Sequence, residues 1–144
     1  MARAEGRKIV NYKTSGPQWT ALHFAAMSGN HIILALLLRN GAAVDALTKD
    51  GWTAIQFASH GGHTECVRLL CNAGADIHYA DPANSETPLH MACREGHKGT
   101  SELLLERGSQ LCVLDCNGVT PLAAAVMRGF QWHVTVTVFE PEKK

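Results

Sequence analysis

The side chains best suited to chemistry in this sequence are its eight histidines and five cysteines. Cys112 and Cys116 are separated by three residues, and Cys93 and His97 precede them. Thiolate and imidazole groups are good ligands for zinc, but this spacing does not resemble a known zinc finger. We therefore expect no metal site at these residues.

Catalytic motifs are missing from the sequence. It contains no P-loop, no glycine-rich dinucleotide fingerprint, no zinc-protease helix motif and no nucleophile elbow. No serine or cysteine has a basic partner at a spacing that indicates an activated nucleophile. The expectation is a protein without catalytic residues and without a cofactor, and therefore not an enzyme.

The composition of the chain limits the classes of partner and the cellular compartment that we expect. Lys and Arg total 13, as do Asp and Glu, so a neutral chain gives no reason to expect nucleic acid as a partner. No apolar run approaches about 20 residues, so no membrane span is expected. The basic start of the chain lacks the apolar block of a secretory signal. An odd number of cysteines at small or apolar positions favours a reducing compartment, in the cytoplasm or the nucleus.

The histidines and cysteines fall within a repeat, and the elements of that repeat must position them. Four threonines open similar segments at intervals of 33, 34 and 33 residues, and a glycine follows each after nine residues. These pairs are Thr20 and Gly29, Thr53 and Gly62, Thr87 and Gly96, and Thr120 and Gly129. A period near 33 residues predicts stacked units, each too thin to bury its own apolar side.

Residues 48–80 predict the content of one unit. A turn precedes Thr53, whose hydroxyl can accept from the first turn of a short helix. Phe57 and its apolar neighbours are expected on the buried side of that helix, which ends at Gly62. A second helix with a leucine-rich inner stripe then runs to Gly74. The unit is therefore a turn followed by two helices.

The residue pattern of these units resembles that of the ankyrin-repeat family. Thr87-Pro-Leu-His90, Gly96-His97 and Leu103-Leu104 follow its pattern in register with the other copies. The resemblance covers residues 15–134 and implies an all-α ankyrin-repeat solenoid of three clear repeats and a degenerate fourth. It also implies structural roles for the histidines in these motifs. Gln18 departs from the pattern, because a turn glycine is expected at its position.

The two ends of the chain differ from the repeats. Residues 1–14 resemble the end of a preceding repeat, because Asn11-Tyr12 stands as far before Thr20 as His78-Tyr79 stands before Thr87. Residues 133–139 alternate β-branched and other residues, so they are either a distorted last helix or an unrelated segment. Residues 135–144 are expected to be a tail outside the repeats.

In the resembled family, partners dock on a concave surface made by the turn tips and the exposed side of the first helices. That resemblance implies candidate partner-binding residues at the tips and at the ends of the first helices. They are Trp19, Met27, Lys49, Asp50, Trp52, His60, Asn84, Glu86, Arg94, Glu95, Asn117, Val119, Met127 and Arg128.

Trp19 and Trp52 are the foremost candidates, since both directly precede the repeat threonine. Tryptophan is costly to expose and is enriched in binding hot spots. The alternative is that the two rings stack on each other and shield the turns. Arg94, Glu95 and Arg128 would give polar specificity, or they only form a solvated surface.

The sequence therefore predicts a monomeric module that binds another protein, as an adaptor, a scaffold or an inhibitor. The alternative is a truncated isoform or fragment of a larger ankyrin-repeat scaffold, channel or enzyme, in which this segment is a spacer. The identity of the partner is not encoded in the repeat pattern.

Overall fold

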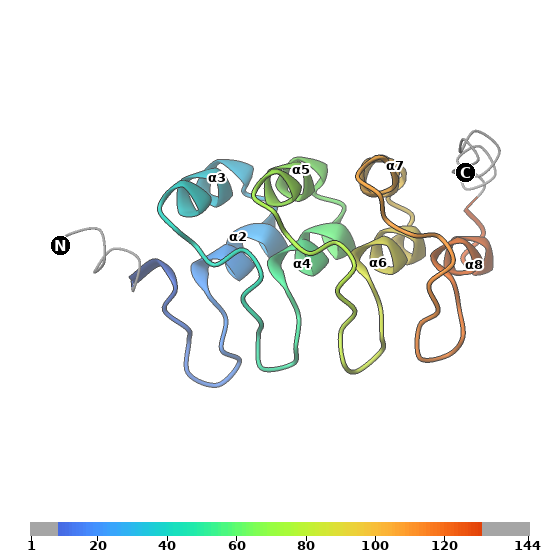
Figure 1. Cartoon of the computed structure of the whole chain (residues 1–144), viewed down its shortest axis with the longest axis horizontal. Helices are drawn as coiled ribbons and strands as arrows, with labels where there is room; N and C mark the ends of the chain where they lie inside the picture. Colours follow the sequence, from blue (N-terminus) through green and yellow to red (C-terminus); the bar gives the residue numbers. More distant parts are fainter. Residues whose placement is uncertain (1–8, 131–144) are drawn as a thin grey trace.

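Helices in two rows make up the molecule. A computed structural model describes residues 9–130, and in this range the secondary structure consists of helices and turns, without strands. Each of three repeats contributes a first and a second helix, and the fourth contributes a first helix (Figure 1). In chain order these are α2 (Ala21–Ser28), α3 (His31–Arg39), α4 (Ala54–Gly61), α5 (Thr64–Asn72), α6 (Pro88–Glu95), α7 (Lys98–Glu106) and α8 (Pro121–Met127).

The first helices and the second helices form separate layers. Helices α2, α4, α6 and α8 pack in succession, while α3, α5 and α7 form the other row (Figure 1). The loops that join successive repeats project together from the side of the first helices as hairpins (Figure 1). The all-α solenoid predicted from the repeat pattern is confirmed.

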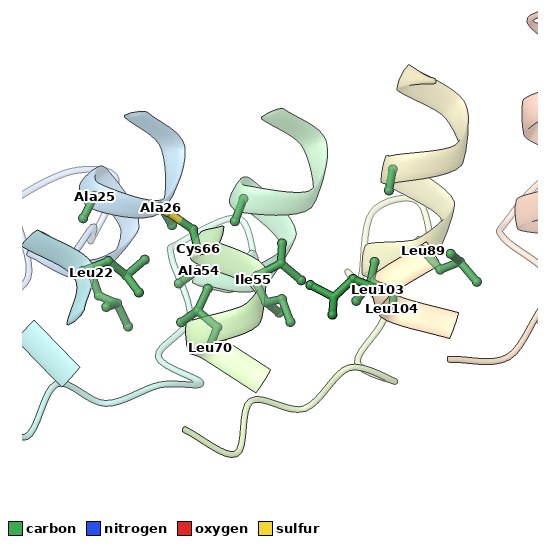
Figure 2. Close-up of a cluster of buried hydrophobic side chains, with 14 of the residues drawn as sticks. Leu22, Ala25, Ala26, Ala54, Ile55, Cys66, Leu70, Leu89, Leu103 and Leu104 are labelled. Carbon is green, nitrogen blue, oxygen red and sulfur yellow. The ribbon is translucent and has the colours of Figure 1, made fainter. Parts of the chain in front are cut away.

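The core lies between the two layers and continues through the stack. Each of the three complete repeats contributes a fully buried leucine or isoleucine from its first helix and a leucine from its second helix, several of them drawn in Figure 2. These residues are Leu22, Ile55, Leu89, Leu34, Leu70 and Leu104. Burying each such side chain stabilises the fold by roughly 1.5–3 kcal/mol.

Two features of the sequence set the ends of the first helices. Thr53 Oγ1 accepts from the backbone N–H of Gln56, while the Gln56 amide oxygen accepts from the Thr53 N–H, which makes a reciprocal cap. Gly62 then ends α4 with a left-handed φ of 71°. The interval from the repeat threonine to the following glycine therefore corresponds to one short helix with its two caps.

The third residue of each complete repeat's first helix also bonds the next hairpin. His23, Gln56 and His90 occupy this position, and each donates to a backbone carbonyl of the following hairpin. The bonds join His23 Nε2 to Ala46 O at 2.8 Å, Gln56 Nε2 to Glu86 O at 2.9 Å, and His90 Nε2 to Val119 O at 3.1 Å. Polar groups inside the stack thus connect neighbouring repeats.

His23 is held as the neutral tautomer with its hydrogen on Nε2. The backbone N–H of Thr20 donates to its Nδ1 at 2.9 Å, so this nitrogen must be unprotonated. Burial lowers the pKa of His23 below its usual value, although the bond to Ala46 acts in the opposite direction. Protonation would place an N–H against the Thr20 donor.

A second link between repeats follows the helix-ending glycines. The His63 ring lies against Gly29, where there is no space for a Cβ, and His63 Nε2 donates to Met27 O at 3.1 Å. His97 repeats this arrangement one unit later, against Gly62 and the carbonyl of His60. Phe130 takes the equivalent position in the fourth repeat and packs on Gly96 without a hydrogen-bonding group.

Phe57 packs against the core, as predicted, but it is only partly buried. Its neighbour Gln56 is completely buried, because the cap described above turns the Gln56 amide inward to bond the next hairpin.

Helix α3 differs from the later second helices. Its Ile33 and Leu36 are 45% and 46% exposed, while Thr100 and Leu103, at the same positions of α7, are buried against α5. Ahead of α2, the described range contains only two helical residues, Ile9 and Val10. The predictions for residues 1–8 and for the tail, including 133–139, concern residues outside the described range.

One position of each hairpin adopts a positive φ. Gly51 and Gly118 have φ values of 80° and 73°, while Gln18 and Ser85 occupy the same position at 56° and 55°. The left-handed region costs roughly 1–2 kcal/mol for a residue with a Cβ. The departure noted at Gln18 is therefore a change of residue without a change of conformation.

We expect Gln18→Gly to stabilise the protein by about 0.5–1 kcal/mol. The relief of the left-handed backbone exceeds the extra entropy that glycine gains in the unfolded chain. Gly118→Gln, the reciprocal control, should destabilise by a similar amount, because no atom lies within 4 Å of a Cβ built there. Urea denaturation measures both changes, and a loss of stability in Gln18→Gly would contradict the explanation.

The neutral state of His23 predicts a pH dependence of stability. Because folding lowers its pKa, the unfolded chain binds the proton more tightly, and the contribution of His23 is present above about pH 6.5 and is lost as the pH falls through the folded pKa. His23→Gln should keep both bonds, as Gln56 does, and should weaken this dependence. Measuring the free energy of unfolding between pH 7.5 and 5 tests this prediction, with His31→Gln, at an exposed residue, as the control. If the free energies of unfolding of wild type and His23→Gln change equally with pH, the assignment is refuted.

Candidate functional site

The hairpins and the exposed side of the first helices form one continuous surface, which we call the hairpin face. Each repeat places on it the last hairpin residue and a residue of the helix end eight positions later. These pairs are Trp19 and Met27, Trp52 and His60, Glu86 and Arg94, and Val119 and Met127. All eight belong to the residues predicted to bind a partner.

Backbone bonds fix the first member of each pair. The N–H of Trp19 donates to Thr14 Oγ1 at 3.0 Å, and the N–H of Trp52 donates to Thr48 Oγ1 at 3.1 Å. In the later hairpins an aspartate replaces the threonine, and Asp81 accepts from the N–H of Glu86 at 2.9 Å. The hairpins therefore present equivalent side chains from a rigid base.

The first half of the hairpin face is an aromatic strip, formed by Trp19, Phe24, Phe57, Trp52 and His60. The Phe57 ring centre lies 4.6 Å from that of Trp19 and 5.0 Å from that of Trp52. Phe24 contacts Trp19 at 5.0 Å and His60 contacts Trp52 at 6.0 Å. The rings are inclined at 47–53°. Such tilted pairs contribute about 0.5–1.5 kcal/mol beyond their buried area.

The two tryptophans are thus held by Phe57 between them, which replaces the direct stacking considered from the sequence. Both tryptophans remain partly exposed, and Phe24 is 45% exposed. The strip is ordered by its own contacts before any partner arrives. Sequence reasoning did not place Phe24 and Phe57 in this strip. Their shared place, four residues after the repeat threonine, is not a surface signal, because Met91 is fully buried at the same place of the third repeat.

The second half of the face is an ionic cluster around Arg94. Arg94 Nη1 pairs with Glu86 Oε1, and Arg94 Nε bonds Glu95 Oε1 at 3.1 Å. Glu95 also lies 3.8 Å from His60 Nε2, which joins the cluster to the aromatic strip. Glu86 and Arg94 therefore occupy the positions that Trp52 and His60 occupy one repeat earlier.

The charges in this cluster stabilise one another. Partial burial acts to lower the pKa of the Arg94 guanidinium, but Glu86 and Glu95 outweigh it and hold that pKa above its usual value. Burial likewise acts to raise the pKa of Glu95, and the bond from Arg94, with the charges of His60 and Arg128, lowers it overall. Both shifts favour the charged forms of Arg94 and Glu95.

Glu86 does not lie at an open tip, as the sequence suggested. Its side chain is 6% exposed, and its Oε2 is buried without a hydrogen-bond partner among the described residues. The carboxylate is covered by Arg94, so its direct contribution is to hold that guanidinium in place. A contact between Glu86 and a partner would require Arg94 to move.

The remaining predicted residues lie around these two halves. The hairpin tips expose Lys49, Asp50, Asn84 and Asn117, while Val119 is half-buried. On the first helices, Met27 and Met127 are 46% and 75% exposed, and Arg128 is exposed directly after α8. Whether any of these residues binds a partner stays a prediction.

The cysteines that were first considered for chemistry differ in burial. Cys93 is buried in the core, with its Sγ 3.7 Å from Ser101 Oγ, and burial raises its pKa to about 11. Cys66 is also buried, while Cys112 and Cys116 are exposed. In residues 9–130, no three His, Cys, Asp or Glu side chains are gathered as metal ligands would be. Nor does this range contain a helix with the length and apolarity needed to span a bilayer.

Comparison with known proteins agrees with this geometry. The model of ankyrin repeats in three copies matches residues 6–81 and 73–138. Similar proteins include ankyrin repeat and SOCS box protein 11 of Danio rerio, 39% identical over 101 residues, and the nuclear factor NF-kappa-B p105 subunit of Gallus gallus, 32% identical over 115 residues. A probable E3 ubiquitin-protein ligase, XBOS32 of Oryza sativa, is 35% identical over 98 residues.

These matches cover most of this chain but little of each relative. The aligned segments take 70%, 77% and 68% of this chain, and 34%, 12% and 20% of the length of the respective relatives. The similarity is therefore to their repeat arrays. Arrays of this kind generally mediate contacts between proteins and are typically not catalytic. By its repeats and their packing, this chain belongs to the ankyrin-repeat family.

Proposed function

We propose that this chain is a non-catalytic module that binds another protein through the hairpin face. It would act as an adaptor, a scaffold or an inhibitor that covers part of its partner. The observation that carries the proposal is the aromatic strip, in which Trp19 and Trp52 remain partly exposed although Phe57 contacts both rings. Rigid, partly exposed tryptophans lose little entropy when a partner covers them.

The position of the strip supports this role. Its side chains come from the hairpins and from α2 and α4, and only Phe57 of the strip is among the residues packed against the core. A partner can therefore cover the strip without disturbing the packing between repeats. The ionic cluster beside it supplies fixed charges that can discriminate between partners.

The setting that we propose is intracellular, in the cytoplasm or the nucleus, with the chain acting as a monomer. All five cysteines are free, and Cys112 and Cys116 are exposed, which fits a reducing compartment. Two of the similar proteins are named for a SOCS box and for E3 ubiquitin ligase activity. Because the matched segments make up 34% and 20% of those proteins, we carry over only the binding role of the repeats.

The binding role is tested by removing the tryptophans. Trp52→Ala, alone and with Trp19→Ala, should weaken binding of a captured partner more than tenfold, because hot-spot truncations cost about 2 kcal/mol or more. Proteins retained from a cell lysate by the wild-type chain would be identified by mass spectrometry, purified and titrated against each variant. Helical circular dichroism should change little.

Ile32→Ala is the matched control for this experiment. Ile32 is 65% exposed on α3, away from the hairpin face, so its truncation removes apolar surface without touching the strip. Equal affinities of the wild type and the tryptophan variants would show that the partner binds outside the aromatic strip and would contradict the proposed face. If the wild-type chain retains no protein, the alternative is favoured, in which the segment is only a spacer. Loss of the helical signal in Trp52→Ala would show that the ring serves the fold.

A further inference from the structure

The pairing of charges on the hairpin face indicates which kinds of side chain a partner presents to it. The aromatic strip offers apolar surface, and His60 is its only titratable member. Covering such a surface favours aliphatic or aromatic side chains, since they need no polar partner when they lose water. The strip therefore provides an anchor for apolar residues.

The carboxylates beside the strip are already engaged. Glu86 is buried beneath Arg94, and Glu95 bonds the same guanidinium and faces His60. A cationic side chain of a partner would have to compete with Arg94 for both. At the hairpin tip, the exposed Lys49 and Asp50 are adjacent and oppose one another in sign.

Arg128 is an exposed charge on this face that a partner can reach. Its charge acts on Glu95, but no described carboxylate lies within ion-pair distance of it. It follows two exposed apolar residues, Val126 and Met127, at 52% and 75%. A guanidinium beside apolar surface is well suited to bind a carboxylate through two parallel hydrogen bonds.

The strip and Arg128 can be reached by one short segment. Helices α4, α6 and α8 are consecutive neighbours in the first layer, and packed helices lie roughly 8–10 Å apart. The separation between the strip and α8 is therefore on the order of 20 Å. A helix of about 13 residues or an extended segment of about 6 residues spans it.

We infer that the partner presents one segment of this length, with apolar side chains on the aromatic strip and an aspartate or glutamate that pairs with Arg128. This inference rests on the proposed function and adds the chemistry of the partner to it. The apolar anchor supplies affinity, and the carboxylate fixes which end of the segment meets the fourth repeat.

A displayed library of random 16-residue peptides tests the inference on the full chain. Peptides would be selected for binding to the wild type, retained only if Trp52→Ala abolishes their binding, and sequenced. We expect an apolar cluster followed or preceded at a constant distance by Asp or Glu. Arg128→Glu should weaken these peptides about tenfold, and replacing their acidic residue by Lys should restore binding to that variant.

Arg39→Glu is the control charge reversal, because Arg39 is exposed at the end of α3, outside the hairpin face. It should leave the selected peptides unaffected, and circular dichroism would verify that every variant is folded. Peptides that depend on Trp52 but lack a conserved carboxylate, or that ignore Arg128→Glu, would overturn this inference and leave the proposed function standing. If no selected peptide depends on Trp52, both are overturned.

Discussion

The whole structure depends on the contact between neighbouring repeats. A single pair of helices of eight and nine residues cannot offset the entropy of ordering its own chain, so each unit is stable only beside another. Apolar side chains such as Leu22, Ile55 and Leu89 supply most of that contact. Their burial is not directional, and it does not by itself fix how one repeat is turned against the next.

The orientation of one repeat against the next is set by the polar groups buried between them. His23, Gln56 and His90 each cap their own helix and bond a carbonyl of the next hairpin. Leaving such a group unpaired would cost about 1–3 kcal/mol, so alternative packings are penalised. Histidine and glutamine are interchangeable here because both offer an acceptor to the cap and a donor at the right reach.

Because these bonds involve backbone carbonyls, the packing of the repeats does not depend on the side chains of the hairpin face. The carbonyl groups of Glu86 and Val119 accept the bonds that hold the stack, while the side chains of these positions belong to the hairpin face. The backbone contact is independent of the residue type, so residues as different as Glu86 and Val119 can stand at this position. The surface can change from aromatic to ionic along the stack without any change in the frame.

Much of the fold was predictable from residues with a local meaning. The threonine that caps a helix and the glycine that ends it act within a few positions, and their period near 33 residues indicated the stack. Trp19 and Trp52 could be assigned to the surface because they share one place in the repeat. Phe57 was assigned to the core, against which it packs, but its ring contacts with both tryptophans could not be predicted, because they depend on how neighbouring repeats pack.

The sequence by itself therefore determined the repeat, the helix pairs, the caps and the residues available at each surface position. The tertiary structure alone decided which of these residues touch across repeats: that Phe57 lies between the two tryptophans, and that Arg94 covers Glu86 and leaves Arg128 open. These contacts join residues about one repeat apart, or from opposite ends of one helix. They depend on side-chain positions that are set only when the layers are packed, which a one-dimensional pattern does not contain.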